Sequence, residues 1–119
     1  MPTDVTFIGM SHSVAMEAAA QAWVERLAKV FDRIQHCTVS IALPHRHKRH
    51  GSRFQVRVTI AVPGHELAVT HEHPQDASHE DAYAALAGAF LAARRRLQGH
   101  AQSVRGHVRR PQLSRAMRA

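Results

Sequence analysis

Arginine side chains in the last third of the sequence have the most evident binding chemistry. Asp81 is the last acidic residue, and half of the sixteen Lys and Arg residues follow it. A guanidinium group keeps its charge and can donate two parallel hydrogen bonds to a phosphate. This segregation of charge favours a nucleic acid as partner, with a solvated helix end or tail as the alternative. The arginines concerned are Arg94, Arg95, Arg96, Arg105, Arg109, Arg110, Arg115 and Arg118.

Three of these arginines, at positions 94 to 96, are consecutive. On a helix, successive side chains project about 100° apart, so the three cannot all bind one phosphate. They could instead contact a groove of nucleic acid that surrounds the helix on two sides. The net charge of +7, with eleven histidines that can add positive charge as the pH falls, also favours a polyanionic partner.

A second basic cluster lies within residues 44–53, a polar segment that we interpret as a loop. It contains His45, Arg46, His47, Lys48, Arg49 and His50. Neutral imidazole is a common metal ligand, but the neighbouring cations would repel a divalent ion. We therefore predict RNA contact here, with an inert loop or a histidine-based metal site as alternatives. His71, His73 and His79 form a second histidine set whose spacing is too weak to predict a metal, so we predict no metal and no cofactor.

The sequence contains no arrangement typical of catalysis. It has no nucleophile elbow, no phosphate-cradling glycine loop and no close pair of carboxylates near a histidine. Cys37 is the only cysteine, and it lies on the apolar face of a predicted strand, which favours a core position. We predict a protein that is not an enzyme.

The compartment can also be predicted from the sequence. A single cysteine suits a reducing environment, no apolar stretch approaches the roughly 20 residues of a membrane span, and the first residues lack the pattern of a signal peptide. These features predict a cytoplasmic protein with no membrane partner.

Hydrophobic periodicity predicts the elements that must position these side chains. A spacing of three to four residues indicates helices, and strict alternation indicates half-buried strands. The predicted order is a strand at 5–9, a helix at 14–34, strands at 37–43, 54–62 and 66–72, and a helix from about 79 to 98. Val62, Pro63 and Gly64 supply turn residues between the last two strands.

This order predicts an α+β fold, β-α-β-β-β-α, in which a four-stranded sheet carries both helices on one face as a two-layer sandwich. The other sheet face, with Arg57 on it, would stay in water. We expect residues 1–98 to form one domain and residues 99–119 to form a basic, disordered tail, because the apolar pattern fades after Gly99.

Five short segments, in this order and spacing, resemble the ribosome hibernation-promoting factors, also called ribosome-associated translation inhibitors, of the sigma-54 modulation protein family. The likeness runs from about residue 5 to residue 106, and Arg95 falls where the family usually keeps a basic residue. The segments are FDRI at 31–34, PHRH at 44–47, VPG at 62–64, HEDAYAAL at 79–86 and AFLAARRRL at 89–97.

The resemblance implies a fold similar to double-stranded RNA-binding domains and a function in the bacterial cytoplasm during stationary phase or stress. The implied partner is the small ribosomal subunit and its rRNA, at a site that overlaps those of messenger and transfer RNA, so that translation is reversibly inhibited. We expect a free monomer and no DNA partner. The alternative functions are a general RNA-binding module and a histidine-based metal-binding protein. The predicted RNA-binding residues are Arg94, Arg95, Arg96, Arg46, Lys48, Arg49, Arg57, His45, His47 and Arg105.

Overall fold

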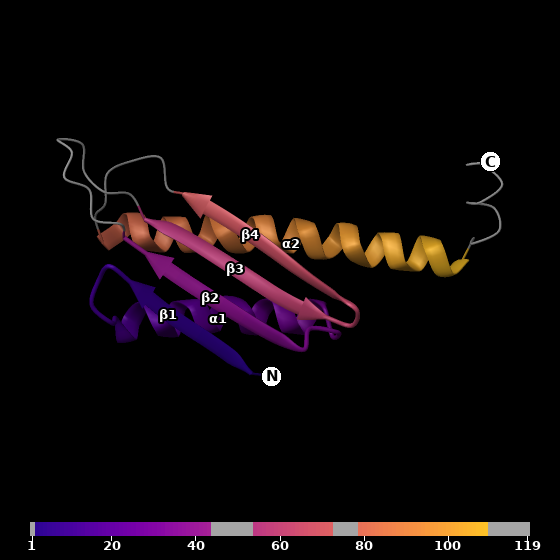
Figure 1. Ribbon diagram of the computed structural model, residues 1–119, viewed down its shortest axis with the longest axis horizontal. Coiled ribbons are helices and arrows are strands. Elements are labelled where there is room, and N and C mark those ends of the chain that lie inside the picture. The colour runs from indigo at the N-terminus through magenta and orange to yellow at the C-terminus, as the bar shows by residue number, and fades with distance from the viewer. Residues whose placement is uncertain (1, 44–53, 73–78, 110–119) are drawn as a thin grey trace.

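The computed structural model describes residues 2–43, 54–72 and 79–109, and it contains the six predicted elements in the predicted order (Figure 1). They are β1 (Thr3–Ile8), α1 (Val14–Val30), β2 (His36–Ala42), β3 (Gln55–Val62), β4 (His65–Glu72) and α2 (His79–Arg109). The strands form one sheet in the order β1-β2-β3-β4. β1 is parallel to β2, and the other neighbours are antiparallel.

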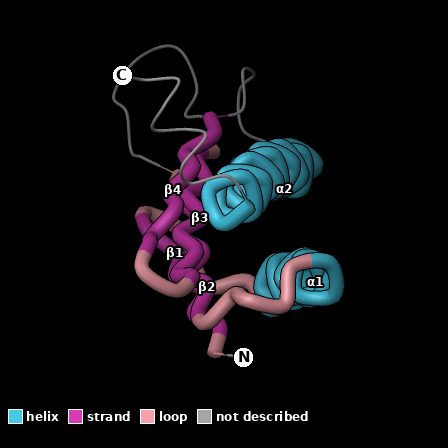
Figure 2. Tube along the Cα trace, turned by 90° about the vertical axis from the view of Figure 1, so that its right-hand side faces the viewer, coloured by secondary structure: helices cyan, strands magenta, loops and turns pink. Residues whose placement is uncertain are grey.

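Both helices pack on the same face of the sheet (Figure 2). The alternating strands turn one set of side chains toward them, and along β2 and β3 this set is fully buried. The opposite set stays partly or fully exposed, as expected for a mostly antiparallel sheet with one face in water. The predicted α+β class and two-layer arrangement are therefore confirmed.

The core lies between the sheet and the two helices. Its sheet side consists mainly of aliphatic residues, together with Cys37 and Phe54. Its α2 side consists largely of alanines, which let the helix approach closely. The α2 residues in it are Ala82, Ala85, Leu86, Ala89, Phe90, Ala93 and Leu97. Trp23 of α1 stacks on Phe90 of α2, with ring centroids 5.7 Å apart and an interplanar angle of 8°. This pair joins the two helices above the sheet.

The predicted turn between β3 and β4 is confirmed. Gly64 has a φ of 76°, the left-handed region that glycine enters most easily. Val62 pairs with His65 across the turn, so Pro63 and Gly64 occupy its two central positions. This arrangement fixes the β3–β4 register and brings the turn toward α2.

The first helix is shorter than predicted. It ends at Val30, and Phe31 is already extended, with φ of −120° and ψ of 100°. Residues 31–34 instead form a bend that returns the chain to β2, while Phe31 and Ile34 pack against the core. Their apolar spacing continued the helical pattern, although they reach the core from a non-helical backbone.

The second helix is longer than predicted. We expected it to end near Gly99, where the apolar pattern fades, but it continues to Arg109. A single glycine within a helix costs only about 1 kcal/mol relative to alanine, which its neighbours can offset. Residues 99–109, which we expected to belong to the tail, are thus helical, and residues 110–119 lie outside the described part. Figure 1 shows the C-terminal part of α2 extending beyond the sheet.

Candidate nucleic-acid interface

The three consecutive arginines lie on the exposed surface of α2. Arg94, Arg95 and Arg96 are all exposed, whereas Ala93 and Leu97 on either side of them are buried. The sheet-facing stripe of the helix thus holds the arginines in place without using them in the core. Beyond Asp81, this helix carries no acidic residue.

The arginines point in three directions. Arg94 lies one turn after Phe90, and residues four apart share a helix face, so Arg94 is on the side that meets α1. Arg96 lies on the side that meets β4, because its Nη1 donates to the backbone carbonyl oxygen of Ala68 at 3.2 Å. Arg95, about 100° from each, points away from the sheet. The helix therefore presents positive charge on both flanks and on its outer side.

Arg57, the other described residue predicted to bind RNA, lies on the opposite face of the sheet. It alternates with the buried Val56 and Val58 on β3, and its Nη1 donates to Thr70 Oγ1 at 3.1 Å. The same strand alternation places Asp4, Glu66 and Glu72 on this open face. The structure therefore does not bring Arg57 onto the surface formed by Arg94 and Arg95. Among the described residues, the open face has no excess of positive charge.

Two cations on α1, which the sequence analysis did not single out, lie on the helical side of the molecule. The Arg26 guanidinium lies 4.8 Å from the centroid of the Trp23 ring, a cation–π geometry. Lys29 is exposed one turn later. The spacing of three between Trp23 and Arg26 is the signal that could have indicated this pair, because it brings both onto one helix face.

The remaining predicted residues cannot be placed. Arg105 belongs to α2, but the structure describes only its backbone. Five others lie in residues 44–53, outside the described part: His45, Arg46, His47, Lys48 and Arg49. They stay predictions, as does their contribution to RNA binding.

The aromatic side chains of the helices and the single cysteine differ in burial. Trp23 and Phe90 pack at the interface between the helices. Tyr83 of α2 is 40% exposed. Cys37 is a core residue as predicted, and burial raises the pKa of its thiol to about 11, which disfavours the reactive thiolate.

The described histidines make contacts with protein groups. The ring of His71 packs against Gly88 of α2, and the rings of His65 and His100 meet edge to face with centroids 5.1 Å apart. His73 lies outside the described part, and the side chain of His79 is not described. Within residues 2–43, 54–72 and 79–109, no group of three metal-ligating side chains could hold an ion. None of the described helices is long and apolar enough to cross a membrane.

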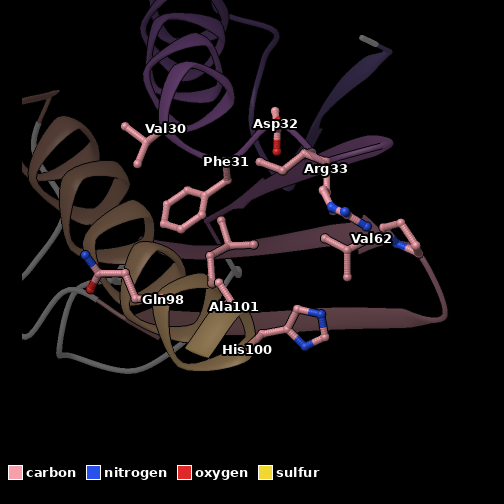
Figure 3. A pocket seen from close by; sticks show the side chains of 11 residues that line it. Val30, Phe31, Asp32, Arg33, Val62, Gln98, His100 and Ala101 are labelled. Carbon is pink, nitrogen blue, oxygen red and sulfur yellow. The ribbon is translucent and has the colours of Figure 1, made fainter. Parts of the chain in front are cut away.

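A hollow of about 600 Å³ lies beyond the arginines, where the end of α1, the β3–β4 turn and α2 meet (Figure 3). The apolar side chains of Phe31, Val62 and Leu97 contribute to its wall. Arg33 and His100 contribute polar groups from two different segments of the chain. Gln98, which lines the hollow, lies one turn after Arg94 on the same face of α2, so the hollow adjoins the Arg94 side of the basic surface.

Comparison with known proteins identifies the fold. Similar solved structures include a ribosomal subunit interface protein from Coxiella burnetii, with a TM-score of 0.68 and 15% identity over 86% of this chain and 99% of that one. The N-terminal domain of Thermus thermophilus Protein Y has a TM-score of 0.66 and 16% identity over 84% of this chain and 99% of that one. At such identities these likenesses show the fold alone.

The family follows from the sequence match. A search of curated proteins found no significant match. The model of the family described as "Sigma 54 modulation protein / S30EA ribosomal protein", however, matches residues 3–105, which include every described helix and strand except the last residues of α2. The chain therefore belongs to the Sigma 54 modulation protein / S30EA ribosomal protein family, as the resemblance indicated.

Proposed function

We propose that this protein associates with the ribosome, binds rRNA of the small subunit and thereby reversibly inhibits translation as a hibernation factor. The observation that carries the proposal is the exposure of Arg94, Arg95 and Arg96 on an acid-free stretch of α2, in a member of a family described as ribosomal. The similar fold of a ribosomal subunit interface protein from Coxiella burnetii agrees with this assignment.

The geometry supports contact with a folded RNA more than with a single phosphate. Arg94 and Arg96 lie on opposite flanks of α2, and Arg95 lies between them on the outer side. An RNA groove that surrounds the helix could place phosphates against each guanidinium. Arg26 and Lys29 add positive charge on α1, which packs beside α2.

Translation would then be inhibited simply because the protein occupies a site on the small subunit. A protein bound where messenger and transfer RNA bind would exclude them, and its dissociation would restore translation. The protein would act in the cytoplasm as a free monomer that binds one small subunit, with no cofactor and no catalytic step. The basic residues of 44–53 and Arg105 would extend the contact surface.

Sedimentation with purified ribosomal subunits tests this function. The protein should travel with the small subunit near one copy per particle at physiological salt. Translation of a reporter message should fall when the protein is added and recover when it is removed. Equal binding to small subunits, large subunits and an unrelated double-stranded RNA would indicate a general RNA-binding module instead, and a protein that stays in the supernatant would contradict ribosome association.

A further inference from the structure

The volume and the lining side chains of the hollow beside the arginines suit one planar ring that carries polar groups. Its volume of about 600 Å³ falls within the range of roughly 300–1,000 Å³ typical of ligand sites. Val62 and Leu97 are buried and form an apolar base, and Phe31, which is partly buried, offers an aromatic ring. Such a lining favours stacking and apolar contact with a flat ring.

The polar groups around this apolar base include a hydrogen-bond acceptor on one side and nitrogen groups on the others. Asp32, directly after the end of α1, supplies a carboxylate, which accepts hydrogen bonds. Arg33 and His100 supply guanidinium and ring nitrogens from the other sides, with Arg33 reaching toward Val62 and His100 approaching from α2 (Figure 3). A nucleobase carries both donors and acceptors on its edge, and its phosphate would suit Arg33.

The charge balance favours a ligand with little net charge. Asp32 offsets Arg33, and a helix C-terminus carries a partial negative charge that opposes binding of a highly anionic molecule. The ion pairs among the described residues are His12 with Glu17 and His36 with Asp4, so Arg33 takes part in neither. One nucleotide of an RNA strand, with a single phosphate, fits this balance better than a free nucleoside triphosphate.

The position of the hollow indicates how such a nucleotide would arrive. Gln98 lines it one turn after Arg94, and residues four apart share a helix face. An RNA whose phosphate contacts Arg94 would therefore lie beside the opening of the hollow. We propose that the hollow accepts the base of one unpaired nucleotide of the bound RNA, stacked against Phe31, with Arg33 on its phosphate.

This inference rests on the proposed RNA binding but can be tested separately from the ribosome. The probes are a single-stranded oligoadenylate of about 12 nucleotides and a chain of the same length with abasic sugars, which keeps the phosphates and removes the bases. The wild-type protein should bind the oligoadenylate roughly tenfold more tightly, since stacking of one base on an aromatic ring is commonly of that size.

Two substitutions test whether the preference for the oligoadenylate over the abasic chain arises in the hollow. Phe31→Leu keeps an apolar side chain for packing but removes the aromatic ring, and Arg33→Gln removes the charge at an exposed position. Lys29→Gln is the matched control, because Lys29 is an exposed cation near the same end of α1 that does not line the hollow. Phe31→Leu should reduce the preference for bases to about twofold or less, and Arg33→Gln should weaken binding of the oligoadenylate more than Lys29→Gln does. Thermal unfolding of each variant checks that the fold is intact.

The outcomes separate this inference from the proposed function. Equal binding of the two oligonucleotides by the wild type, or an undiminished preference in a folded Phe31→Leu variant, overturns the hollow as a base site while leaving sedimentation with the small subunit unaffected. Adenosine monophosphate that binds as tightly as the oligoadenylate would also overturn it, because the site would then serve a free nucleotide. A clear base preference that disappears in Phe31→Leu supports it even if ribosome association fails.

Discussion

Arg96 on α2 donates from its Nη1 to the backbone carbonyl oxygen of Ala68 on β4 at 3.2 Å. β4 is an edge strand, and this bond ties the helix to the outer strand of the sheet. Arg96 therefore has a structural contact in addition to the RNA contact predicted for it, whereas Arg95 points away from the sheet. Residues adjacent in the sequence can thus differ in their effects on stability and binding.

Replacing these two arginines individually should separate stability from binding. Arg96→Ala should lower the free energy of unfolding by about 1 kcal/mol, because it removes a hydrogen bond to the backbone. Arg95→Ala should change it by less than ~0.5 kcal/mol, as is usual for an exposed side chain. Both should weaken binding to the small subunit. Urea unfolding and sedimentation measure the two effects, and equal unfolding free energies for the two variants would argue against the Arg96–Ala68 contact.

Because Gly88 of α2 contacts the His71 ring, replacing it with alanine should lower the free energy of unfolding, although alanine usually stabilises a helix. A Cβ at Gly88 would overlap the His71 ring, so Gly88→Ala should destabilise the protein by roughly 1–3 kcal/mol despite the better helix propensity of alanine. Gly99→Ala is the matched control. A Cβ there meets nothing within 4 Å, so this change should stabilise the helix by up to about 1 kcal/mol.

The double variant with His71→Ala should recover much of the stability that Gly88→Ala loses, because the smaller side chain makes room for the added methyl group. Thermal unfolding of the single and double variants measures this coupling. Additive effects of the two substitutions would show that the His71 ring is not the obstacle.

Burial of Cys37 predicts a loss of stability at alkaline pH. The pKa of the buried thiol is raised to about 11 from 9.0, so the folded state favours the neutral thiol. This contribution to stability is fully present below about pH 9 and is lost as the pH rises through 9 toward 11. The free energy of unfolding should therefore fall more steeply for the wild type than for Cys37→Val over that range. Identical pH profiles would contradict this role of the buried Cys37 thiol.

RNA binding should depend steeply on salt, because phosphate contacts from arginine release counterions. We expect a log–log slope of about −0.7 to −0.9 for each phosphate neutralised. Titration of the protein with small subunits between low and physiological salt measures this slope. A nearly flat titration would mean that charge is not the main source of affinity.

Much of the fold could be predicted from the sequence because its hydrophobic periods are clear. Strict alternation from Val56 to Val62 indicated the central strand, and the stripe through Leu86, Ala93 and Leu97 indicated the second helix. The two helix ends were missed for different reasons. Phe31 and Ile34 keep the apolar spacing of a helix in a bend, and residues 99–109 remain helical without large apolar side chains.

The candidate site was less predictable, because it depends on which face each side chain occupies. The predicted arginines of α2 are exposed together, but Arg57 lies on the far face of the sheet. The hollow combines Phe31, Val62 and Leu97, which lie far apart in the sequence, so no local pattern could indicate it. Tyr83 fits a helical apolar pattern by residue type and is nevertheless exposed.

The most direct test of the proposed binding surface compares two arginine variants in binding to purified small ribosomal subunits. One variant replaces Arg94, Arg95 and Arg96 with alanine, and the other replaces four arginines nearer the C-terminus, Arg109, Arg110, Arg115 and Arg118, which removes more charge. If α2 provides a specific docking surface, the first variant should lose at least about tenfold in affinity, the equivalent of roughly 1.4 kcal/mol, and should be the weaker binder. A larger loss in the second variant would show diffuse electrostatic attraction and contradict the proposed binding surface.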